Sequence, residues 1–167
     1  MRPTIAVITG SLGRPSLEQV RRDVRRQMMP GDEHCVVVGG AYDESHNLAL
    51  GRAAADWLMF VTDDDLILPG AMNRIRKIVP ANPTRMHLFQ CIGAGWSAPR
   101  IKEWETGGGM CVTPNIPGKV GLWGGRRLGD FDFITSTLAL LGAEPIWRNE
   151  HIVRYNYYVG RQMSARA

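Results

Sequence analysis

The sequence has few cysteines and no long hydrophobic run, and each absence excludes a class of protein. Three of its 167 residues are cysteines, at positions 35, 91 and 111. Their odd number and wide spacing fit neither a disulfide framework nor a set of zinc ligands, which favours a reducing compartment. No run approaches the roughly 18–20 apolar residues of a membrane helix, and the first apolar run, residues 4–9, is too short for a signal peptide. We therefore expect a cytoplasmic protein with no transmembrane segment.

Internal repeats, low-complexity stretches and a recognisable linker are also missing, which predicts one domain over residues 1–167. Hydrophobic residues make up 44% of the chain, which is enough for a single core. The formal net charge of +4 favours anionic partners such as nucleotide phosphates, nucleic acid or an acidic membrane surface. Ordinary solubilising charge is the alternative explanation.

Strand-like and helical patterns alternate along the chain, which predicts an α/β fold. Strands are expected at residues 4–9, 34–38, 57–62, 86–92, 146–147 and 152–158, and helices at residues 16–28, about 44–55, 69–79 and 130–141. Ser16 is expected to begin the first helix as a capping box, and its four arginines, at positions 21, 22, 25 and 26, to face outward. Residues 93–125 hold nine of the 19 glycines and are expected to form short strand-like pieces and loops.

Three consecutive carboxylates, Asp63, Asp64 and Asp65, follow the apolar run at residues 57–62. Ligands bind at the carboxyl ends of strands in open α/β sheets, and three adjacent negative charges repel one another unless a cation lies among them. Mg²⁺ and Mn²⁺ prefer oxygen ligands and often bind one or two carboxylates together with substrate phosphates. The triplet therefore predicts a metal–diphosphate site. The alternative is a solvated acidic turn, or a helix start favoured by the helix dipole.

Around the triplet, the chain resembles family 2 glycosyltransferases with the GT-A fold, in which a small helix and an aromatic strand lead to a DxD motif and a Leu-Pro-Gly turn. The resemblance lies in residues 46–72, HNLALGRAAADWLMFVTDDDLILPGAM. It implies the nucleotide-diphospho-sugar transferase fold, with a mixed, mostly parallel sheet flanked by helices. Residues 1–92 would then form the half that binds the nucleotide sugar, and residues 93–167 the half that holds the acceptor and the catalytic base.

The resemblance extends to the loop after the first strand, where SLGRP, residues 11–15, is similar to the family's Thr-Tyr-Asn-Arg-Pro that lines the nucleotide site. It implies that Ser11 and Arg14 contact the donor. The second strand departs from the family, because Gly39 and Gly40 stand where two aspartates usually follow. Asp43 is the nearest carboxylate in the sequence and is the candidate to replace them. The alternative is that backbone groups bind the nucleobase of the donor.

Within the triplet, the resemblance places Asp63 near the ribose or base of the donor. It favours Asp65 as the metal ligand, while Asp64 competes for that role and is also a candidate donor contact. The metal would be Mn²⁺ or Mg²⁺. In the C-terminal part, Arg154-Tyr155-Asn156 stands where the family often has Arg-x-His. His151 is therefore a candidate additional metal ligand, although a lone histidine is more often structural, and His46 has the same ambiguity.

Asp130, in the run Gly129-Asp130-Phe131-Asp132-Phe133, stands where the family has its catalytic base. A carboxylate at a helix N-terminus stays ionised, as a base requires. The alternatives are that Asp130 only caps the helix, or that Asp132 is the base.

These residues together predict a metal-dependent glycosyltransferase that moves a sugar from a nucleotide-diphosphate sugar to a hydroxyl acceptor with inversion. The acceptor is left open between a saccharide, a lipid-linked sugar, a protein and a nucleic acid. One alternative is a nucleotidyltransferase, whose Gly-x-Gly-x-Arg loop is only half matched by Gly10, Gly13 and Arg14. The other is a non-catalytic module that binds glycans or nucleic acid on a degenerate transferase scaffold.

Overall fold

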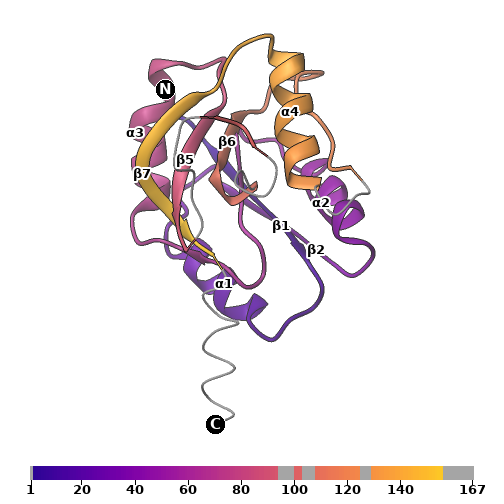
Figure 1. The fold of residues 1–167 in the computed structure, drawn as a ribbon. Helices are drawn as coiled ribbons and strands as arrows, with labels where there is room; N and C mark the ends of the chain where they lie inside the picture. The colour runs from indigo at the N-terminus through magenta and orange to yellow at the C-terminus, as the bar shows by residue number, and fades with distance from the viewer. Residues whose placement is uncertain (1, 94–99, 103–107, 125–128, 156–167) are drawn as a thin grey trace.

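The protein folds into three layers, with a seven-stranded sheet between two pairs of helices (Figure 1). This computed structural model describes residues 2–93, 100–102, 108–124 and 129–155. One face of the sheet carries α1 (Leu17–Arg25) and α3 (Ala71–Ile78), and the other carries α2 (Tyr42–Leu50) and α4 (Gly129–Leu141). None of the described helices is long and apolar enough to cross a membrane, and the cytoplasmic location stays a prediction.

The sheet has the strand order β2-β1-β3-β6-β5-β7-β4. Its strands are β1 (Ile5–Ser11), β2 (Glu33–Val38), β3 (Trp57–Phe60), β4 (Leu66–Ile67), β5 (His87–Ile92), β6 (Cys111–Pro114) and β7 (Ile146–Arg154). Antiparallel pairing turns β6 and β4 against the other five strands. Two short 3₁₀ helices, η1 (Val79–Ala81) and η2 (Gly108–Met110), complete the described elements. The structure confirms the predicted fold class, a mixed and mostly parallel sheet flanked by helices.

The sheet separates two hydrophobic cores, because alternate residues of each buried strand face opposite layers. On β1, Val7 packs in the core that includes Val20 and Val24 of α1. Its neighbour Ile8 faces the other core, with Ala49 of α2 and Phe133 of α4. All seven residues of β1 are buried, which is why its first four residues, Ile5 to Ile8, are all apolar rather than alternating with polar ones.

Several element boundaries differ from those predicted. Helix α2 ends at Leu50 instead of extending to residue 55, because the carboxylate of Glu33 accepts hydrogen bonds from the N–H groups of Ala54 (2.8 Å) and Ala55 (3.4 Å). Ser16 precedes α1 but its side chain makes no capping hydrogen bond. The strand expected at residues 146–147 and the start of the one expected at residues 152–158 form a single strand, β7, while residues 156–158 lie outside the described residues. The two-residue strand β4 was not predicted.

The register of the sheet sets the ends of β1 and β3 beside each other. Ile8 pairs with Phe60, and the Val61 N–H donates to the carbonyl of Ile8 at 3.1 Å. The Thr9 hydroxyl donates to the carbonyl of Val61 at 2.8 Å, which extends the contact one residue further. As a result, Ser11 at the end of β1 lies opposite Asp63, so the loop after β1 and the acidic triplet meet at one edge.

A buried ion pair between Asp32 and Arg76 joins the start of the sheet to α3. Side-chain exposure is 5% for Arg76 and 0% for Asp32. The Asp32 carboxylate also accepts hydrogen bonds from the N–H groups of Ile5 (3.0 Å) and Met29 (2.7 Å). Removing the carboxylate would leave a buried guanidinium without its counterion, which is a large penalty.

We therefore expect Asp32→Ala to lower the free energy of unfolding by about 3–5 kcal/mol. Urea denaturation measures the loss. The matched control is Glu18→Ala, which removes the partner of Arg21 in an exposed ion pair at 2.7 Å and should cost no more than about 1 kcal/mol. Equal losses in the two variants would mean that the Asp32 pair is worth no more than a surface contact.

Candidate functional site

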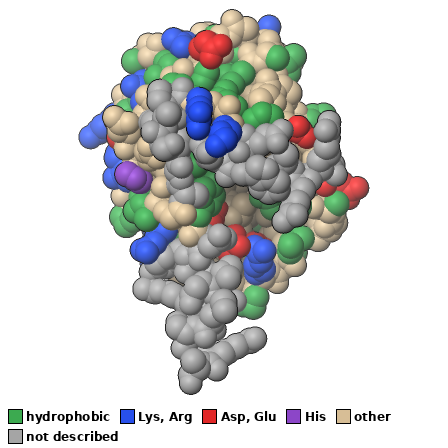
Figure 2. Space-filling view, in the orientation of Figure 1, with side chains coloured by type: hydrophobic (Ala, Val, Ile, Leu, Met, Phe, Trp, Pro, Cys, Tyr) green, Lys and Arg blue, Asp and Glu red, His purple; other side chains and the backbone are tan. Residues whose placement is uncertain are grey.

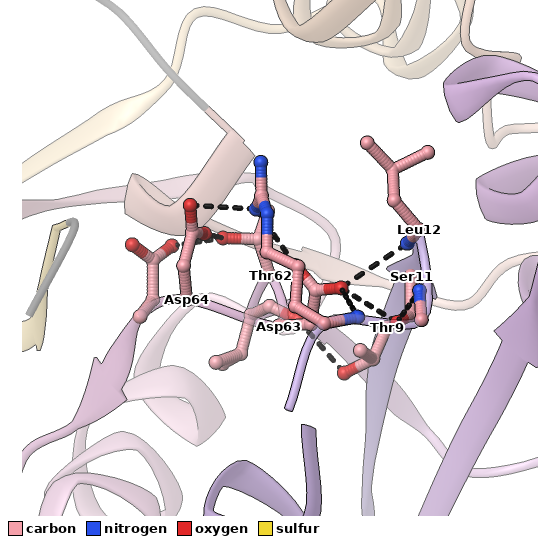
Figure 3. Close-up of polar contacts among 10 residues, drawn as sticks. Thr9, Ser11, Leu12, Thr62, Asp63 and Asp64 are labelled. Atoms are coloured by element: carbon pink, nitrogen blue, oxygen red, sulfur yellow. Dashed lines mark hydrogen bonds and ion pairs between the residues drawn. The ribbon is translucent and has the colours of Figure 1, made fainter. Parts of the chain in front are cut away.

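Asp63 is buried and binds the loop that follows β1 (Figure 3). Its Oδ2 accepts hydrogen bonds from the Ser11 hydroxyl at 2.6 Å, the Leu12 N–H at 3.1 Å and the Arg14 N–H at 3.4 Å. The Ser11 oxygen in turn accepts from the Gly13 N–H at 2.9 Å. A single carboxylate therefore fixes the conformation of the loop that the sequence predicted to line the donor site.

Arg14 lies across the first two carboxylates of the triplet. Its Nη1 is 2.8 Å from Asp63 Oδ1 and 2.6 Å from Asp64 Oδ2. The two carboxylates are almost buried, with side-chain exposures of 3% and 10%, whereas Arg14 keeps 41% of its side chain exposed. On the face drawn in Figure 2, acidic and basic side chains meet near the lower centre of the described surface. One guanidinium thus offsets part of the negative charge at the edge of the sheet.

Thr62 brings the last two carboxylates of the triplet, Asp64 and Asp65, together. Its hydroxyl lies 2.8 Å from Asp64 Oδ1 and 2.6 Å from Asp65 Oδ2. A hydroxyl has one proton, so it donates to only one of these oxygens at a time. The hydroxyl therefore holds the two carboxylates close to each other, and closely spaced carboxylate oxygens are ligands that Mg²⁺ and Mn²⁺ prefer.

Asp130 lies in the first turn of α4, and the structure places it next to the buried η2 segment. The Gly108 N–H donates to Asp130 Oδ2 at 2.8 Å. Burial raises the pKa of Asp130 above the ordinary 3.8, while the Gly108 N–H and the nearby His46 lower it in part. A raised proton affinity is what a general base needs in order to accept a proton near neutral pH. Since α4 begins at Gly129, Asp130 is not the residue that precedes the helix.

Two tyrosines, Tyr42 and Tyr155, lie within electrostatic range of both Asp130 and the acidic triplet. Burial raises the pKa of Tyr42, and the charges of Asp130, Asp65, Asp64 and Asp63 raise it further. Burial likewise raises the pKa of Tyr155, with additional contributions from Asp130 and Asp65. All four carboxylates therefore lie within electrostatic range of Tyr42, although they come from separate parts of the sequence.

His46 and Trp123 form an aromatic wall behind this region. Their rings stack at 4.2 Å between centroids, and the Tyr42 ring lies 4.3 Å from the His46 ring. His46 Nδ1 is 2.7 Å from the carbonyl of Tyr42, and because a carbonyl only accepts, Nδ1 carries the proton. The other ring nitrogen, Nε2, is buried and has no hydrogen-bond partner among the described residues. Burial lowers the pKa of His46, while the Tyr42 carbonyl and the charge of Asp130 raise it in part.

Two glycines in this region are needed because their backbone lies too close to the aromatic rings for a side chain to fit. A Cβ on Gly10 would lie 2.3 Å from His46 Nδ1, and a Cβ on Gly108 would lie 2.6 Å from the Trp123 ring and 3.5 Å from Asp130 Oδ2. No side chain fits at either position without displacing the aromatic wall. The glycines at the end of β1 and in η2 are therefore required by packing.

The remaining predicted residues are more scattered. Asp43 lies in the first turn of α2, where its charge raises the pKa of His46 against the larger effect of burial. His151 is exposed on β7, three residues before Arg154, and its backbone carbonyl accepts a hydrogen bond from Arg74 at 3.2 Å. Gly39, which replaces an expected aspartate, has φ +88° and open space where a Cβ would lie.

The described side chains suit a cation that completes its coordination with a ligand. Among them, no group of three His, Cys, Asp or Glu side chains is arranged to hold a metal ion. Asp64 and Asp65 nevertheless present oxygens around one hydroxyl, and Mg²⁺ in phosphate-binding sites commonly uses one or two carboxylates and takes its other ligands from water and phosphate. The donor chemistry therefore fits Mn²⁺ or Mg²⁺, and the roles of Asp64, Asp65 and His151 stay predictions.

The sequence reasoning missed Tyr42 and Thr62. Thr62 directly precedes the triplet, and a hydroxyl beside two carboxylates was a readable signal. Tyr42 had no such signal, because only the packing of α2 brings it to the acidic edge. Trp96, Trp104 and Gly107, in the half of the chain predicted to hold the acceptor, lie outside the described residues. Gly108 and Gly109 of the same segment are buried beside Asp130 and Tyr155.

Comparisons with protein-family models and with curated proteins find no match. Among solved structures, S. aureus TarS 1-349 matches with a TM-score of 0.65 and 12% identity, over 92% of this chain and 60% of that chain. Its complex with UDP matches with a TM-score of 0.62 and 12% identity, over 90% and 60% of the two chains. Its complex with UDP-GlcNAc matches with a TM-score of 0.63 and 12% identity, over 92% and 58%.

The TM-scores show that this chain and TarS share a fold. At 12% identity, the comparison shows nothing beyond the fold. This chain spans about 60% of the length of TarS 1-349. The predicted GT-A fold is thereby confirmed, with the acidic edge of the sheet described above as its candidate site. Membership of family 2 stays a prediction, since no family model matches.

The raised pKa of Asp130 predicts how stability depends on pH. Because the folded state holds this proton more tightly than the unfolded state, stability falls as the pH rises from 3.8 through the raised folded value. Asp130→Asn removes that titration and can keep the contact with Gly108. The variant should therefore melt at a higher temperature than the wild type at pH 7, and the difference should vanish below pH 3.8. A melting temperature that is lower at pH 7 would contradict a carboxylate destabilised by burial.

Proposed function

We propose that this protein is a metal-dependent glycosyltransferase that moves a sugar from a nucleotide-diphosphate sugar to a hydroxyl acceptor and inverts the anomeric configuration. The observation that carries the proposal is the chain of contacts that joins Asp130 to the acidic triplet: the Gly108 N–H donates to Asp130, Gly109 lies against the Tyr155 ring, and Arg154 pairs with Leu66 directly after Asp65. A transferase of this kind needs a cationic site for a diphosphate leaving group and a separate base for the acceptor. The two sets of carboxylates correspond to these two needs.

The structural neighbours support the choice of donor. S. aureus TarS, which has the same fold, has been crystallised with UDP and with UDP-GlcNAc, a nucleotide-diphosphate sugar. The same edge of the sheet in this chain carries the loop of Ser11 and Arg14 and the acidic triplet. We therefore place the donor at the carboxyl ends of β1 and β3, with its diphosphate beside Asp64 and Asp65.

On the donor side, Arg14 is the group that moves. In the structure its guanidinium is bound to Asp63 and Asp64, and in the donor complex we expect it to turn toward the phosphates, whose oxygens it can bind as a fork. Asp64 and Asp65 would hold the Mn²⁺ or Mg²⁺. When bound, that ion supplies the positive charge that stabilises the leaving diphosphate. Asp63 keeps the loop in place throughout.

On the acceptor side, Asp130 is the base. Its carboxylate takes the proton of the acceptor hydroxyl while the hydroxyl oxygen forms a bond to the anomeric carbon. The bond between that carbon and the phosphate oxygen breaks on the opposite side, and the nucleoside diphosphate leaves with its electron pair. The Gly108 N–H holds one carboxylate oxygen at 2.8 Å, so the other oxygen is the one that accepts the proton.

The nucleobase of the donor would be recognised without the pair of aspartates that the family usually has after the second strand. Gly39 and Gly40 both have positive φ and lie beside the exposed side chains of Leu12 and Val38. Gly39 has open space where a Cβ would lie, whereas a Cβ on Gly40 would lie 3.4 Å from Glu44 Oε2. A base there would rest on apolar side chains and bond to backbone groups, with Asp43 as the nearest predicted carboxylate. The donor sugar and the acceptor are left open.

Binding of a nucleoside diphosphate should require a divalent ion, because the acidic edge otherwise repels the phosphates. With UDP at about a hundred times its Kd, Mn²⁺ should raise the melting temperature by roughly 5–10 °C, since such binding is worth about 2.7 kcal/mol. Asp65→Ala should abolish this increase while the melting temperature of the unliganded protein changes little.

A chelator and a second variant control this experiment. EDTA in place of Mn²⁺ should remove the effect of UDP on the wild-type protein. Retention of the full Mn²⁺-dependent shift in Asp65→Ala, with its loss in Asp64→Ala, would move the metal ligand to Asp64. Equal stabilisation by UDP with and without Mn²⁺ would contradict metal dependence.

Asp130→Asn should separate catalysis from binding. Asparagine can keep the hydrogen bond from Gly108 but accepts no proton, so transfer should fall by about 10²-fold or more while the affinity for the nucleotide sugar persists. A panel of nucleotide sugars identifies the donor by Mn²⁺-dependent thermal shift or hydrolysis, and turnover then compares the variants.

The matched control is Asp132→Asn, the same change two residues along α4. Asp132 is the alternative base, and its side chain lies beside Gly124. Near-normal turnover in the Asp132 variant with loss in the Asp130 variant supports the assignment. The reverse pattern would transfer the role of base to Asp132. Wild-type turnover in both variants would exclude both residues.

A further inference from the structure

A second charged cavity lies on the open edge of the sheet, away from the acidic site. It has a volume of about 550 Å³ and is lined by Arg21, Arg25, Met28, His34, Cys35, Val36 and Arg52. Strand β2 is the edge strand here, so the cavity opens beside the sheet rather than at the carboxyl ends of its strands. None of its lining residues belongs to the cluster around Tyr42.

Three guanidinium groups reach this cavity from two directions. Arg21 and Arg25 are one turn apart on α1, whereas Arg52 follows α2 and lies 3.5 Å from the carbonyl of Val36 on β2. Arg21 also contacts the exposed carboxylate of Glu18 at 2.7 Å, a pair that is weak in water. Among the described residues no carboxylate lines the cavity itself. The Glu33 carboxylate lies 4.0 Å from the lining Cys35 Sγ and accepts hydrogen bonds from the N–H groups of Ala54 and Ala55, so three guanidiniums face one peripheral carboxylate and positive charge predominates.

The four arginines of α1 therefore divide into two pairs. Arg22 and Arg26 bond along the helix, to the Gln19 side chain at 2.6 Å and to Asp23 at 3.4 Å, and neither lines the cavity. Arg21 and Arg25 do line it. The sequence pattern had assigned all four to an ordinary outward face, and only the packing of α1 against β2 distinguishes them.

His34 lines the cavity, and its pKa depends on the charges of the neighbouring arginines. Its Nε2 lies 3.1 Å from the Thr9 hydroxyl, whose own proton goes to the carbonyl of Val61, so Nε2 carries the hydrogen and Nδ1 is the free acceptor. Burial, Arg21 and Arg25 together lower the pKa of His34 to about 4. An anion between the guanidiniums would oppose their effect and favour the protonated ring.

We propose that this cavity binds the phosphate group of a small phosphorylated molecule. Guanidinium forks match phosphate oxygens and bind them by charge-assisted hydrogen bonds. The volume is larger than a phosphate needs and falls in the range of small-molecule sites, and the apolar side chains of Met28 and Val36 offer contacts for the organic part. This site is separate from the donor site, because its residues come from α1, β2 and the turn after α2 and none of them belongs to the acidic triplet.

The test uses histidine-ring NMR of the complete chain in EDTA, which prevents metal-dependent binding at the acidic edge. The probes are inorganic phosphate and ribose 5-phosphate, with ribose as the uncharged control. Both phosphates should shift the His34 ring signals saturably and raise its pKa above about 4, and ribose 5-phosphate should bind more tightly. Ribose alone should shift nothing.

The matched variants are Arg21→Gln/Arg25→Gln and Arg22→Gln/Arg26→Gln, which remove the same charge from the same helix. The first pair should weaken phosphate binding by at least about tenfold, and the second should leave it close to wild type. Equal weakening by both pairs would mean that only diffuse charge attracts the anion, and would overturn the proposal. Unchanged His34 signals in the wild-type protein at saturating ribose 5-phosphate would overturn it as well.

Discussion

The contact between Asp63 and the loop after β1 is the interaction on which the rest of the candidate site depends. A buried carboxylate is tolerated only where hydrogen bonds and countercharge replace its water, and Asp63 obtains both from Ser11, Leu12 and Arg14. The same bonds decide where the Arg14 guanidinium lies, and hence the charge that Asp64 experiences. The acidic residue closest to the strand therefore holds the loop in place and sets the surroundings of its two neighbours, while its predicted contact with the donor stays a prediction.

Much of this arrangement could be predicted from the sequence, for a physical reason. An apolar run ending in carboxylates places them at a sheet edge, and parallel pairing of β1 with β3 brings Ser11 and Arg14 to the same edge. These consequences follow from local patterns and from the geometry of parallel sheets. The resemblance over residues 46–72 added the identity of the fold, which the structure confirms.

Other features lay beyond sequence reasoning because they depend on contacts between distant elements. Tyr42 comes within electrostatic range of the carboxylates only because α2 packs beside them. Strand β4 has two residues and exists because Leu66 and Ile67 pair with the end of β7. Helix α2 was predicted to be too long because Glu33 of strand β2 accepts hydrogen bonds from the N–H groups of Ala54 and Ala55, which a longer helix would have used. In each case a tertiary contact overrode a local preference.

The pairing at the end of β7 also has a consequence for the acidic triplet. Leu66, directly after Asp65, pairs with Arg154, and the Tyr155 N–H donates to the carbonyl of Ile92 at 3.0 Å. The backbone that follows the triplet is therefore fixed to β7, although the two segments are almost ninety residues apart in the sequence. A substitution that loosens β7 would reach the carboxylates through this backbone pairing, without touching any of their side chains.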